Sequence, residues 1–540
     1  MKQTILSGFA GAVLLTSMLS CGKEDNDKPA LPRPPEGWDQ VEHTEYPQIE
    51  ASIPMPEGTK GGRILDFSRV GYRWGDEPIP DVPVVKTLQA PADGSDASTL
   101  LKDAITEVSK LPLNGRHRGA ILLKAGTYNV STTFTIAAGG IVIRGEGPDK
   151  TRIVGVGKRT VNIDAMTPTI FAIGGTGERR GTRPGSPNVV EDYVPEGRFF
   201  VRVSNPSDFA VSDNVVIYRD INDQWIKDLG MTGIWTTSSV NRQYAERVVT
   251  RISKDTLWFE NPVPCALEKK YGGGYVYKYN YLDRTSECGI EDLALESEFF
   301  SENDENHFWN GVMFNTCEHC WMRNVTGKYF GACLAYIRQY AKNITVQDCN
   351  CTDFQSTIDG SRRYPYLICG QLSLVKNCNS ADSRHPYATS GSNSVGPNVF
   401  SGGTALRSTA DTGPHRCWAT GTLYENLDVE GQFNIRNRYT NSKHGWAGAN
   451  DVAWNCSSKS FPEVAWSYGF IIQSPQVSAR NYAIGCVGTF KTNTFDVGCN
   501  PPSGEGVILS KGTNVAPRSL LEAQKELRSR TQPGGVFDVQ

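Results

Sequence analysis

The chain has 540 residues, of which 39% are hydrophobic and 21% are charged, a composition that is ordinary for a globular protein. Its formal net charge is −3 at neutral pH, which excludes a global basic field of the kind that attracts nucleic acid. Any attraction for a charged ligand must therefore come from a local patch. The 54 glycines and 30 prolines favour many short strands joined by many turns.

Residues 1–21 predict an export signal, because Lys2 precedes an apolar run that is too short to span a bilayer comfortably. The run ends in MLSC, which resembles a bacterial lipobox with Cys21 as the lipidated cysteine. This resemblance implies an exported lipoprotein, anchored to the outer membrane through Cys21 and exposed on the cell surface. The alternative is a plain secretory signal with an incidental cysteine. Residues 22–50 are rich in proline and charge and predict a flexible tether.

Residues 51–172 are predicted to form an N-terminal cap and the first strands. The stretch 96–111 has apolar residues at helical spacing and an N-terminal capping signal. Two β-like stretches follow it, at 119–136 and 139–155. Residues 173–285 combine a Gly/Arg/Pro-rich segment with strand-turn-strand patterns, and they predict an inserted β-rich subdomain.

Short β-like runs recur over residues 286–512 at intervals of 23 to 31 residues. Their anchor positions are Ile290, Trp321, Ile344, Leu374, Val399, Leu423, Val452 and Tyr482. A period of this length in strands predicts an all-β fold, a single right-handed parallel β-helix that rises about 4.8 Å with each coil. The open ends of such a stack must be covered. We therefore expect an N-terminal capping helix and, within 513–540, a C-terminal capping helix and tail.

The chain has 14 cysteines, which in an exported protein invite a prediction of disulfides. However, Cys349, Cys378, Cys456 and Cys486 each end a short strand, with spacings of 378 − 349 = 29 and 486 − 456 = 30. Free cysteine is compact and easily buried, so we expect stacked core thiols, with pairing of some left open. The CEHC motif at 317–320 has metal-like spacing, but no second pair lies near it and no metal is expected there.

Three of the seven histidines recur at one phase of the repeat: His385, His415 and His444 are spaced 30 and 29 residues apart. Each has a cationic neighbour and an aromatic neighbour, and more cations lie one coil away. These flanking residues are Arg384, Arg416, Lys443, Tyr387, Trp418, Trp446, Arg362, Arg363, Tyr364, Arg438 and Asn450. Arginine forks suit carboxylates and sulfates, and histidine exchanges protons near neutral pH. The pattern predicts a groove for an anionic ligand, and the alternative is turn-capping histidines with solvated arginines.

Several segments resemble exported bacterial β-helix proteins of the pectate-lyase-like superfamily. They include DENHFW, SRRYPY, SRHPY, GPHRCWATG, HGWAGAND and PRSLLEAQ, and the resemblance covers roughly Asp93 to Arg530. The superfamily contains polysaccharide lyases and glycoside hydrolases. The resemblance therefore implies a carbohydrate-active protein whose partner is a polysaccharide, and it does not specify the reaction.

The first hypothesis is a lyase, which needs a group that neutralises a uronate carboxylate, a base and an acid. Arg384 or Arg416 would bind the carboxylate, and His415 would be the base, with His385 and His444 beside it. Tyr364 or Tyr387 would protonate the leaving oxygen, and the remaining aromatic residues, arginines and Asn450 would bind the substrate. No cofactor is expected, although calcium is left open because some relatives use it.

Two other hypotheses stay open. A hydrolase needs two carboxyl groups, and Asp353, Asp382 and Asp411 are spaced 29 and 29 residues apart. Asp382 and Asp411 would be its catalytic pair, unless these aspartates only cap turns. Glu305 and His307 could also reach the groove. The third hypothesis is a non-catalytic glycan-binding lipoprotein, which the titratable histidines disfavour.

Overall fold

The computed structural model describes residues 39–41, 50–52 and 64–531, except 176, 178, 239–241, 282–283, 440–442, 462–467 and 493–503. The predicted lipidation site Cys21 lies outside the described residues, as does most of the predicted tether. At the end of that tether, β1 (Asp39–Val41) pairs antiparallel with β2 (Glu50–Ser52). Within the described ranges, no helix has the length and apolar character needed to cross a membrane.

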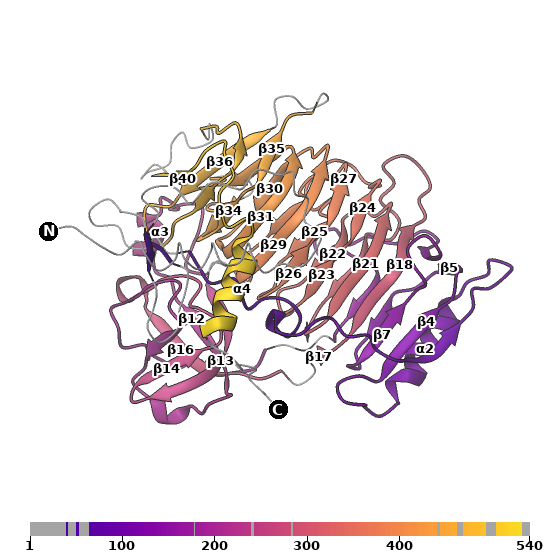
Figure 1. The fold of residues 1–540 in the computed structure, drawn as a ribbon, viewed down its shortest axis with the longest axis horizontal. Helices are drawn as coiled ribbons and strands as arrows, with labels where there is room; N and C mark the ends of the chain where they lie inside the picture. Colours follow the sequence, from indigo (N-terminus) through magenta and orange to yellow (C-terminus); the bar gives the residue numbers. More distant parts are fainter. Residues whose placement is uncertain are drawn as a thin grey trace.

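The chain winds into a right-handed parallel β-helix whose strands stack along the long axis of the molecule (Figure 1). One wall is a long parallel sheet, and a second wall is a ten-stranded sheet. The long sheet contains β3 (Val84–Leu88), β4 (Gly119–Leu123), β5 (Gly126–Val130), β7 (Ile141–Arg144), β8 (Thr151–Gly155), β18 (Gly289–Ser297), β21 (Trp321–Lys328), β23 (Thr345–Gln347), β24 (Asn350–Thr352), β26 (Leu374–Lys376), β27 (Asn379–Ala381), β29 (Val395–Leu406), β31 (Ala419–Glu430), β33 (Gly448–Ala449), β34 (Val452–Trp454), β35 (Ser457–Lys459), β37 (Tyr482–Ile484), β38 (Val487–Gly488) and β40 (Val507–Leu509).

The ten-stranded sheet carries the candidate site. Its strands are β6 (Phe134–Ile136), β9 (Thr169–Ile173), β19 (Asn310–Phe314), β22 (Cys333–Ile337), β25 (Tyr366–Ile368), β28 (Tyr387–Thr389), β30 (Asp411–Pro414), β32 (Gln432–Ile435), β36 (Gly469–Ser474) and β39 (Gly504–Glu505). All neighbouring strands are parallel except the last pair, β36 and β39. A short parallel pair between β17 (Thr285–Ser286) and β20 (Cys317–Glu318) lies outside both sheets.

The sequence repeat corresponds to the coils. Leu374, Val399, Leu423, Val452 and Tyr482 are direct partners in consecutive coils, as their spacing predicted. The earlier anchors are off by one residue, because Trp321 pairs with Gly289 and Thr345 rather than with Ile290 and Ile344. The predicted parallel β-helix is confirmed.

All twelve cysteines in the described part of the chain are free. The four that end strands, Cys349, Cys378, Cys456 and Cys486, are fully buried, which confirms the prediction of core thiols. Each follows a residue with a left-handed backbone that bends the chain between two strands: Asp348, Asn377, Asn455 and Gly485, with φ between 51° and 69°. Burial raises the pKa of the Cys378 and Cys456 thiols well above its usual value, so both thiols stay protonated and pack as apolar groups.

The two terminal helices have different roles. Helix α2 (Ser98–Ser109) buries Leu101 and Val108 against the core of the first coils and covers that end of the stack. Helix α4 (Leu520–Thr531) instead packs Leu520 and Leu521 against the outer side of the long sheet (Figure 1). This position corrects the expectation of an end cap within 513–540. The in-register anchors point outward as an apolar stripe, and α4 covers that stripe together with residues 64–70.

The inserted segment between β9 and β17 forms an antiparallel sheet of β11 (Phe200–Arg202), β14 (Thr256–Phe259), β13 (Gln243–Ser253), β12 (Asn214–Arg219) and β16 (Gly274–Lys278). It also contains α3 (Asp223–Asp228) and a second pair, β10 (Tyr193–Val194) with β15 (Leu267–Glu268). The subdomain packs on the β-helix, because Val395 of β29 belongs to its apolar core. Trp225 of α3 likewise shares a buried cluster with Trp418 and Trp446 of the later coils.

Candidate functional site

Four aromatic rings lie in contact in one column outside the ten-stranded sheet; Tyr364 is tilted against His385, and the three imidazoles meet edge to face. The ring centroids of Tyr364 and His385 are 4.7 Å apart, those of His385 and His415 are 4.6 Å apart, and those of His415 and His444 are 4.8 Å apart. We call Tyr364, His385, His415 and His444 the histidine column. The spacings of 30 and 29 residues thus bring the three imidazoles together on one side of the molecule.

Strand register explains why these rings meet. Tyr366 of β25 pairs with Tyr387 of β28, so Tyr364 and His385 each lie two residues before the start of paired strands. His415 follows β30, where its backbone N–H donates to the Thr389 carbonyl at 2.7 Å. Ala388 of β28 and Gly413 of β30 are direct partners and lie between His385 and His415. Neither has a side chain large enough to separate the two imidazole rings.

Glycine is required at position 413 for a backbone reason. Its φ is +130°, and a Cβ there would collide with the carbonyl of Asn434 in the next coil. A residue with a side chain would therefore have to displace β32 or leave its own strand. The smallest residue consequently lies between His385, which precedes β28, and His415, which follows the neighbouring strand β30.

His385 is held by a buried carboxylate. Its Nδ1 is 2.7 Å from the backbone carbonyl oxygen of Asp411 and 3.1 Å from the Asp411 Oδ1. Arg438 and Asn434 also donate to the Asp411 carboxylate. Burial opposes ionisation of Asp411, but Arg438 and His385 outweigh it and hold the pKa of Asp411 well below its usual range. His385 therefore carries its hydrogen on Nδ1, and its Nε2, which is buried, has no partner among the described residues.

The column is uncharged at neutral pH. Burial, with a smaller contribution from Arg438, lowers the pKa of His415 well below its usual value and that of His444 to about 4. Burial also lowers the pKa of His385. Burial raises the pKa of Tyr364 to about 12, so its hydroxyl keeps the proton. The Tyr364 Oη lies 3.2 Å from the His415 Nε2, which makes a neutral donor and a neutral acceptor direct partners.

Two arginines beside the column have no carboxylate partner in the described part of the chain. Arg384 lies 5.9 Å from the centroid of the Tyr364 ring, and its Nη1 donates to the Arg362 carbonyl at 3.4 Å. Arg416 is exposed and forms no ion pair with any described residue. Three other predicted cations are occupied: Arg362 binds Glu305 (Nη2 to Oε2, 2.8 Å), Arg363 is buried on the Ser356 carbonyl, and Arg438 binds Asp411. Among the described residues, the predicted cations left for an anionic ligand are thus Arg384, Arg416 and the exposed Lys443.

The structure contradicts the roles expected for the aromatic neighbours. Tyr387 is inside the β-helix, where its Oη donates to the Cys378 carbonyl at 2.6 Å and its ring stacks on Tyr366. Trp418 and Trp446 are buried beneath the inserted subdomain, with the Trp418 ring centroid 5.0 Å from that of Trp225. These three rings cannot contact a substrate, because the core or the inserted subdomain covers them.

Three more predicted groove residues are also structural. Asn450 is buried and donates through Nδ2 to the Pro264 carbonyl of the inserted subdomain at 3.0 Å. His307 is fully buried, with Nδ1 2.9 Å from the Ser297 Oγ and Nε2 2.8 Å from the Gln355 carbonyl oxygen. Glu305 is bound to Arg362. None of the three is free to act on a ligand, because each polar group already has a protein partner.

The predicted pair of catalytic aspartates is not formed. Asp382 is half-buried in a bend and accepts two hydrogen bonds of 2.7 Å from Arg407, whereas Asp411 is buried against His385. Ala381 pairs with Leu406, so the next-coil neighbour of Asp382 is Arg407. The spacing of 29 residues was misleading because this coil advances by only 406 − 381 = 25 residues. What the spacing missed is that Asp411 is the partner of His385.

Among the described residues, no three His, Cys, Asp or Glu side chains are grouped so that they could hold a metal ion. Cys317 and Cys320 of the CEHC motif are both fully buried in the core. The site is therefore built from imidazole, phenol and guanidinium groups, which can exchange protons and bind anions.

No protein-family model and no curated protein matches the chain. Among solved structures, the chain is similar to the tailspike protein gp49 from Pseudomonas phage LKA1, with 13% identity, a TM-score of 0.43, and 74% of this chain and 62% of that chain covered. It is also similar to the Gp54 tailspike of Acinetobacter baumannii bacteriophage AP22, solved with a capsular saccharide (12% identity, TM-score 0.43, 74% and 56% covered). A third similar structure is the catalytic domain of a GH87 alpha-1,3-glucanase in complex with nigerose (11% identity, TM-score 0.32, 81% and 67% covered). The chain spans about three fifths of the length of the two tailspikes.

Proposed function

We propose that the histidine column is the active site of an enzyme that cleaves an acidic polysaccharide by β-elimination at a uronic acid residue. The observation that carries this proposal is the contact between Tyr364 and His415 beside Arg384 and Arg416. A neutral imidazole can accept a proton, a protonated phenol can donate one, and the two guanidinium groups can bind a carboxylate. These are the three functions that β-elimination requires of a protein.

In the proposed reaction, Arg416, with Arg384, binds the carboxylate of the uronic acid and stabilises the charge that develops when the neighbouring C–H bond breaks. His415 Nε2 takes that proton. The electron pair forms a double bond between C4 and C5 as the bond from C4 to the leaving oxygen breaks. Tyr364 gives its hydroxyl proton to that oxygen. The reaction leaves His415 protonated and Tyr364 deprotonated, and the contact of 3.2 Å returns the proton from His415 to Tyr364.

His385 acts as a positioning residue in this scheme. Its ring lies against both Tyr364 and His415, and Asp411 sets its orientation through Nδ1. The fixed carboxylate also offsets part of the repulsion that a transiently protonated His415 would meet from Arg438. A change at His385 should therefore affect the alignment of the acid and the base more than the binding of substrate.

The glycoside hydrolase alternative loses its predicted carboxylate pair, because Asp382 and Asp411 have different surroundings and different partners. Binding without catalysis is the remaining alternative, since Arg384 and Arg416 suit an anionic glycan in either case. The proposed location is the outer membrane, with a lipid on Cys21. Replacing Cys21 by serine should release the protein from the membrane fraction into the soluble fraction, whereas continued membrane association would contradict the anchor.

The test is to incubate the protein with polysaccharides rich in uronic acid and to follow the ultraviolet absorbance of the unsaturated product. A neutral glucan is the control substrate. We expect absorbance to rise only with the acidic polymers. New reducing ends without absorbance would indicate a hydrolase, and binding without cleavage would indicate a glycan-binding protein; either result overturns the proposed reaction.

A further inference from the structure

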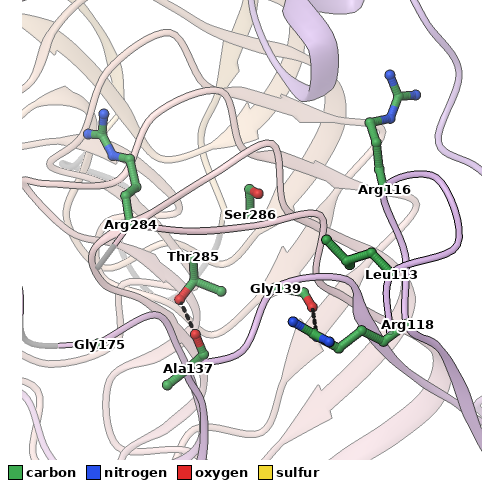
Figure 2. A pocket seen from close by; sticks show the side chains of 9 residues that line it. All are labelled: Leu113, Arg116, Arg118, Ala137, Gly139, Gly175, Arg284, Thr285 and Ser286. Atoms are coloured by element: carbon green, nitrogen blue, oxygen red, sulfur yellow. Dashed lines mark hydrogen bonds between the residues drawn. The ribbon is translucent and has the colours of Figure 1, made fainter. Parts of the chain in front are cut away.

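A pocket of about 460 Å³ opens near the first coils of the β-helix. Figure 2 shows the side chains that line it. Four segments that are distant in sequence form it: the loop 111–118 after α2, the turn after β6, Gly175 after β9, and residues 284–286 at β17. In the order of the ten-stranded sheet, β6 lies six strands before β30, the strand that positions His415. At about 4.8 Å per strand, that separation is on the order of 30 Å. The volume is in the range of small-molecule binding sites.

The charged residues that line this pocket are Arg116, Arg118 and Arg284, and the described lining contains no carboxylate. Figure 2 shows Arg116 and Arg284 on opposite sides of Ser286, with Arg118 beside Gly139. Arg284 is nearly buried and is oriented by Glu246, which its Nη1 reaches at 2.8 Å. Arg116 is held by Glu77 through both terminal nitrogens, with Nη1 at 3.1 Å, and its Nε lies 3.9 Å from Glu287. These carboxylates are outside the described lining, but they neutralise Arg116 and Arg284, so Arg118 is the lining cation left for a ligand.

Arg118 is the lining arginine whose positive charge is not neutralised by a carboxylate among the described residues. Its Nε donates to the Gly139 carbonyl at 3.1 Å and its Nη1 donates to the Leu111 carbonyl, and both acceptors are neutral. In the described part of the chain, no carboxylate forms an ion pair with Arg118, and its Nη2 has no hydrogen-bond partner. A guanidinium that is fixed by two carbonyls and open at a third nitrogen is a preorganised donor for an anion.

The same pocket offers partners for hydroxyl groups. The Ser286 side chain lines it between the two outer arginines and makes no hydrogen bond with any described residue. The Gly139 carbonyl oxygen, which Arg118 uses on one side, retains a second lone pair. A bare sulfate or phosphate would leave most of the volume and these hydroxyl partners unused. A hydroxylated carboxylate of monosaccharide size would use both Arg118 and the polar groups.

We propose that this pocket is a second ligand site, which binds a sugar acid such as a hexuronate through Arg118 and Ser286, independently of the histidine column. The inference rests on the pocket alone and does not require the proposed reaction. It assigns the sugar carboxylate to Arg118 and the sugar hydroxyl groups to Ser286 and the neighbouring carbonyls.

The experiment is calorimetric titration of the whole protein with galacturonate, galactose and inorganic sulfate at low ionic strength. We expect galacturonate to bind about tenfold or more tightly than galactose or sulfate, because only galacturonate satisfies both sets of partners. Arg118→Gln should weaken galacturonate binding about tenfold. Ala137→Phe, which places a ring in the pocket from an exposed position without altering its charges, should abolish this binding. Arg152→Gln, an exposed arginine outside the pocket, is the matched control and should change nothing.

The titration is repeated with His415→Ala to separate this site from the column. Unchanged galacturonate affinity in His415→Ala, together with weaker binding in Arg118→Gln, supports the second site whether or not the protein cleaves polysaccharide. The inference is overturned if galacturonate does not bind, if Arg118→Gln and Ala137→Phe bind like the unmodified protein, or if His415→Ala removes all binding. Equal affinity for sulfate and galacturonate would contradict the assignment to a sugar acid.

Discussion

The hydroxyl of Tyr364 and the Nε2 of His415 are 3.2 Å apart although 51 residues separate them in the sequence. The two rings meet edge to face, with centroids 5.5 Å apart, and the His385 ring contacts both. Burial keeps the phenol protonated and the imidazole neutral at neutral pH. The pair therefore holds a proton donor and a proton acceptor in the states that an elimination reaction needs.

Tyr364→Phe removes the proposed acid and keeps the ring. We expect kcat on a uronic-acid polysaccharide to fall by roughly 10²–10⁴-fold with KM little changed, because the lost group acts on the leaving oxygen. Tyr271→Phe is the matched control, since Tyr271 is also buried and donates to a side chain, Asp228, within the inserted subdomain. Equal losses in both variants would show that Tyr364 has only a structural role.

Arg416→Gln removes an exposed cation that has no ion pair among the described residues. We expect KM for the acidic polymer to rise by about tenfold and the salt dependence of KM to weaken, because one charge-assisted contact with the carboxylate is lost. Arg407→Gln is the control, because Arg407 is exposed but already bound to Asp382. An unchanged KM in Arg416→Gln would remove Arg416 from the binding surface.

The buried histidines should make the protein acid-sensitive. In the unfolded chain a histidine titrates near pH 6.5, whereas burial and Arg438 lower the pKa of folded His444 to about 4. Between these values the unfolded state binds more protons than the folded state. The contribution of His444 to the free energy of unfolding is therefore complete above pH 6.5 and decreases as the pH falls toward 4. Urea unfolding at several pH values should show a weaker pH dependence in His444→Gln, while Lys443→Gln should keep the original dependence. An identical slope in both variants would contradict the shifted pKa.

Asp451 is a fully buried acid in a row of amide side chains. Its Oδ1 accepts the Thr422 N–H at 2.7 Å, while its Oδ2 has no partner in the described part of the chain. In the next coil Asn481, and two coils earlier Asn398, accept backbone N–H groups in the same way. Burial raises the pKa of Asp451 well above its usual value, so its contribution to stability is present at low pH and is lost as the pH rises. Asp451→Asn should raise the free energy of unfolding by about 1 kcal/mol or more at neutral pH. The gain should disappear near pH 4; a loss of stability at neutral pH would contradict this assignment.

Leu521 of α4 tests the position of the C-terminal helix. Its side chain is fully buried against the long sheet, so Leu521→Ala should lower the free energy of unfolding by about 2–5 kcal/mol. Leu406→Ala, at a position that is 37% exposed, should cost much less. Similar effects of the two substitutions in denaturant unfolding would indicate that α4 does not cover the apolar stripe.

The coils could be predicted from sequence because the β-helix repeats its side-chain chemistry once per turn. Leu374, Val399 and Leu423 are direct partners for this reason, and the same periodicity brings the three imidazoles together. The roles of Trp418 and Asn450 could not be predicted. Their partners, Trp225 and Pro264, belong to a subdomain that lies about 190 residues earlier in the sequence. No local sequence pattern indicates these contacts.

Spacing also fails where coil length varies. Asp382 and Asp411 look periodic, but the coil between β27 and β29 is short, so Asp382 meets Arg407 while Asp411 enters the other sheet. Strand register, which the sequence does not encode as a simple count, decides which carboxylate meets a histidine. For the same reason the sequence predicts only that Tyr364 and His415 lie on the same side of the β-helix. The donor and acceptor geometry of their contact follows only from the fold.

The most direct test of the proposed reaction is to run it in oxygen-18-labelled water and to weigh the products by mass spectrometry. β-Elimination adds no water to either fragment, so the account predicts one unsaturated fragment and no incorporated label. Incorporation of one labelled oxygen at the cleaved bond would identify hydrolysis and would contradict the roles given to Tyr364 and His415.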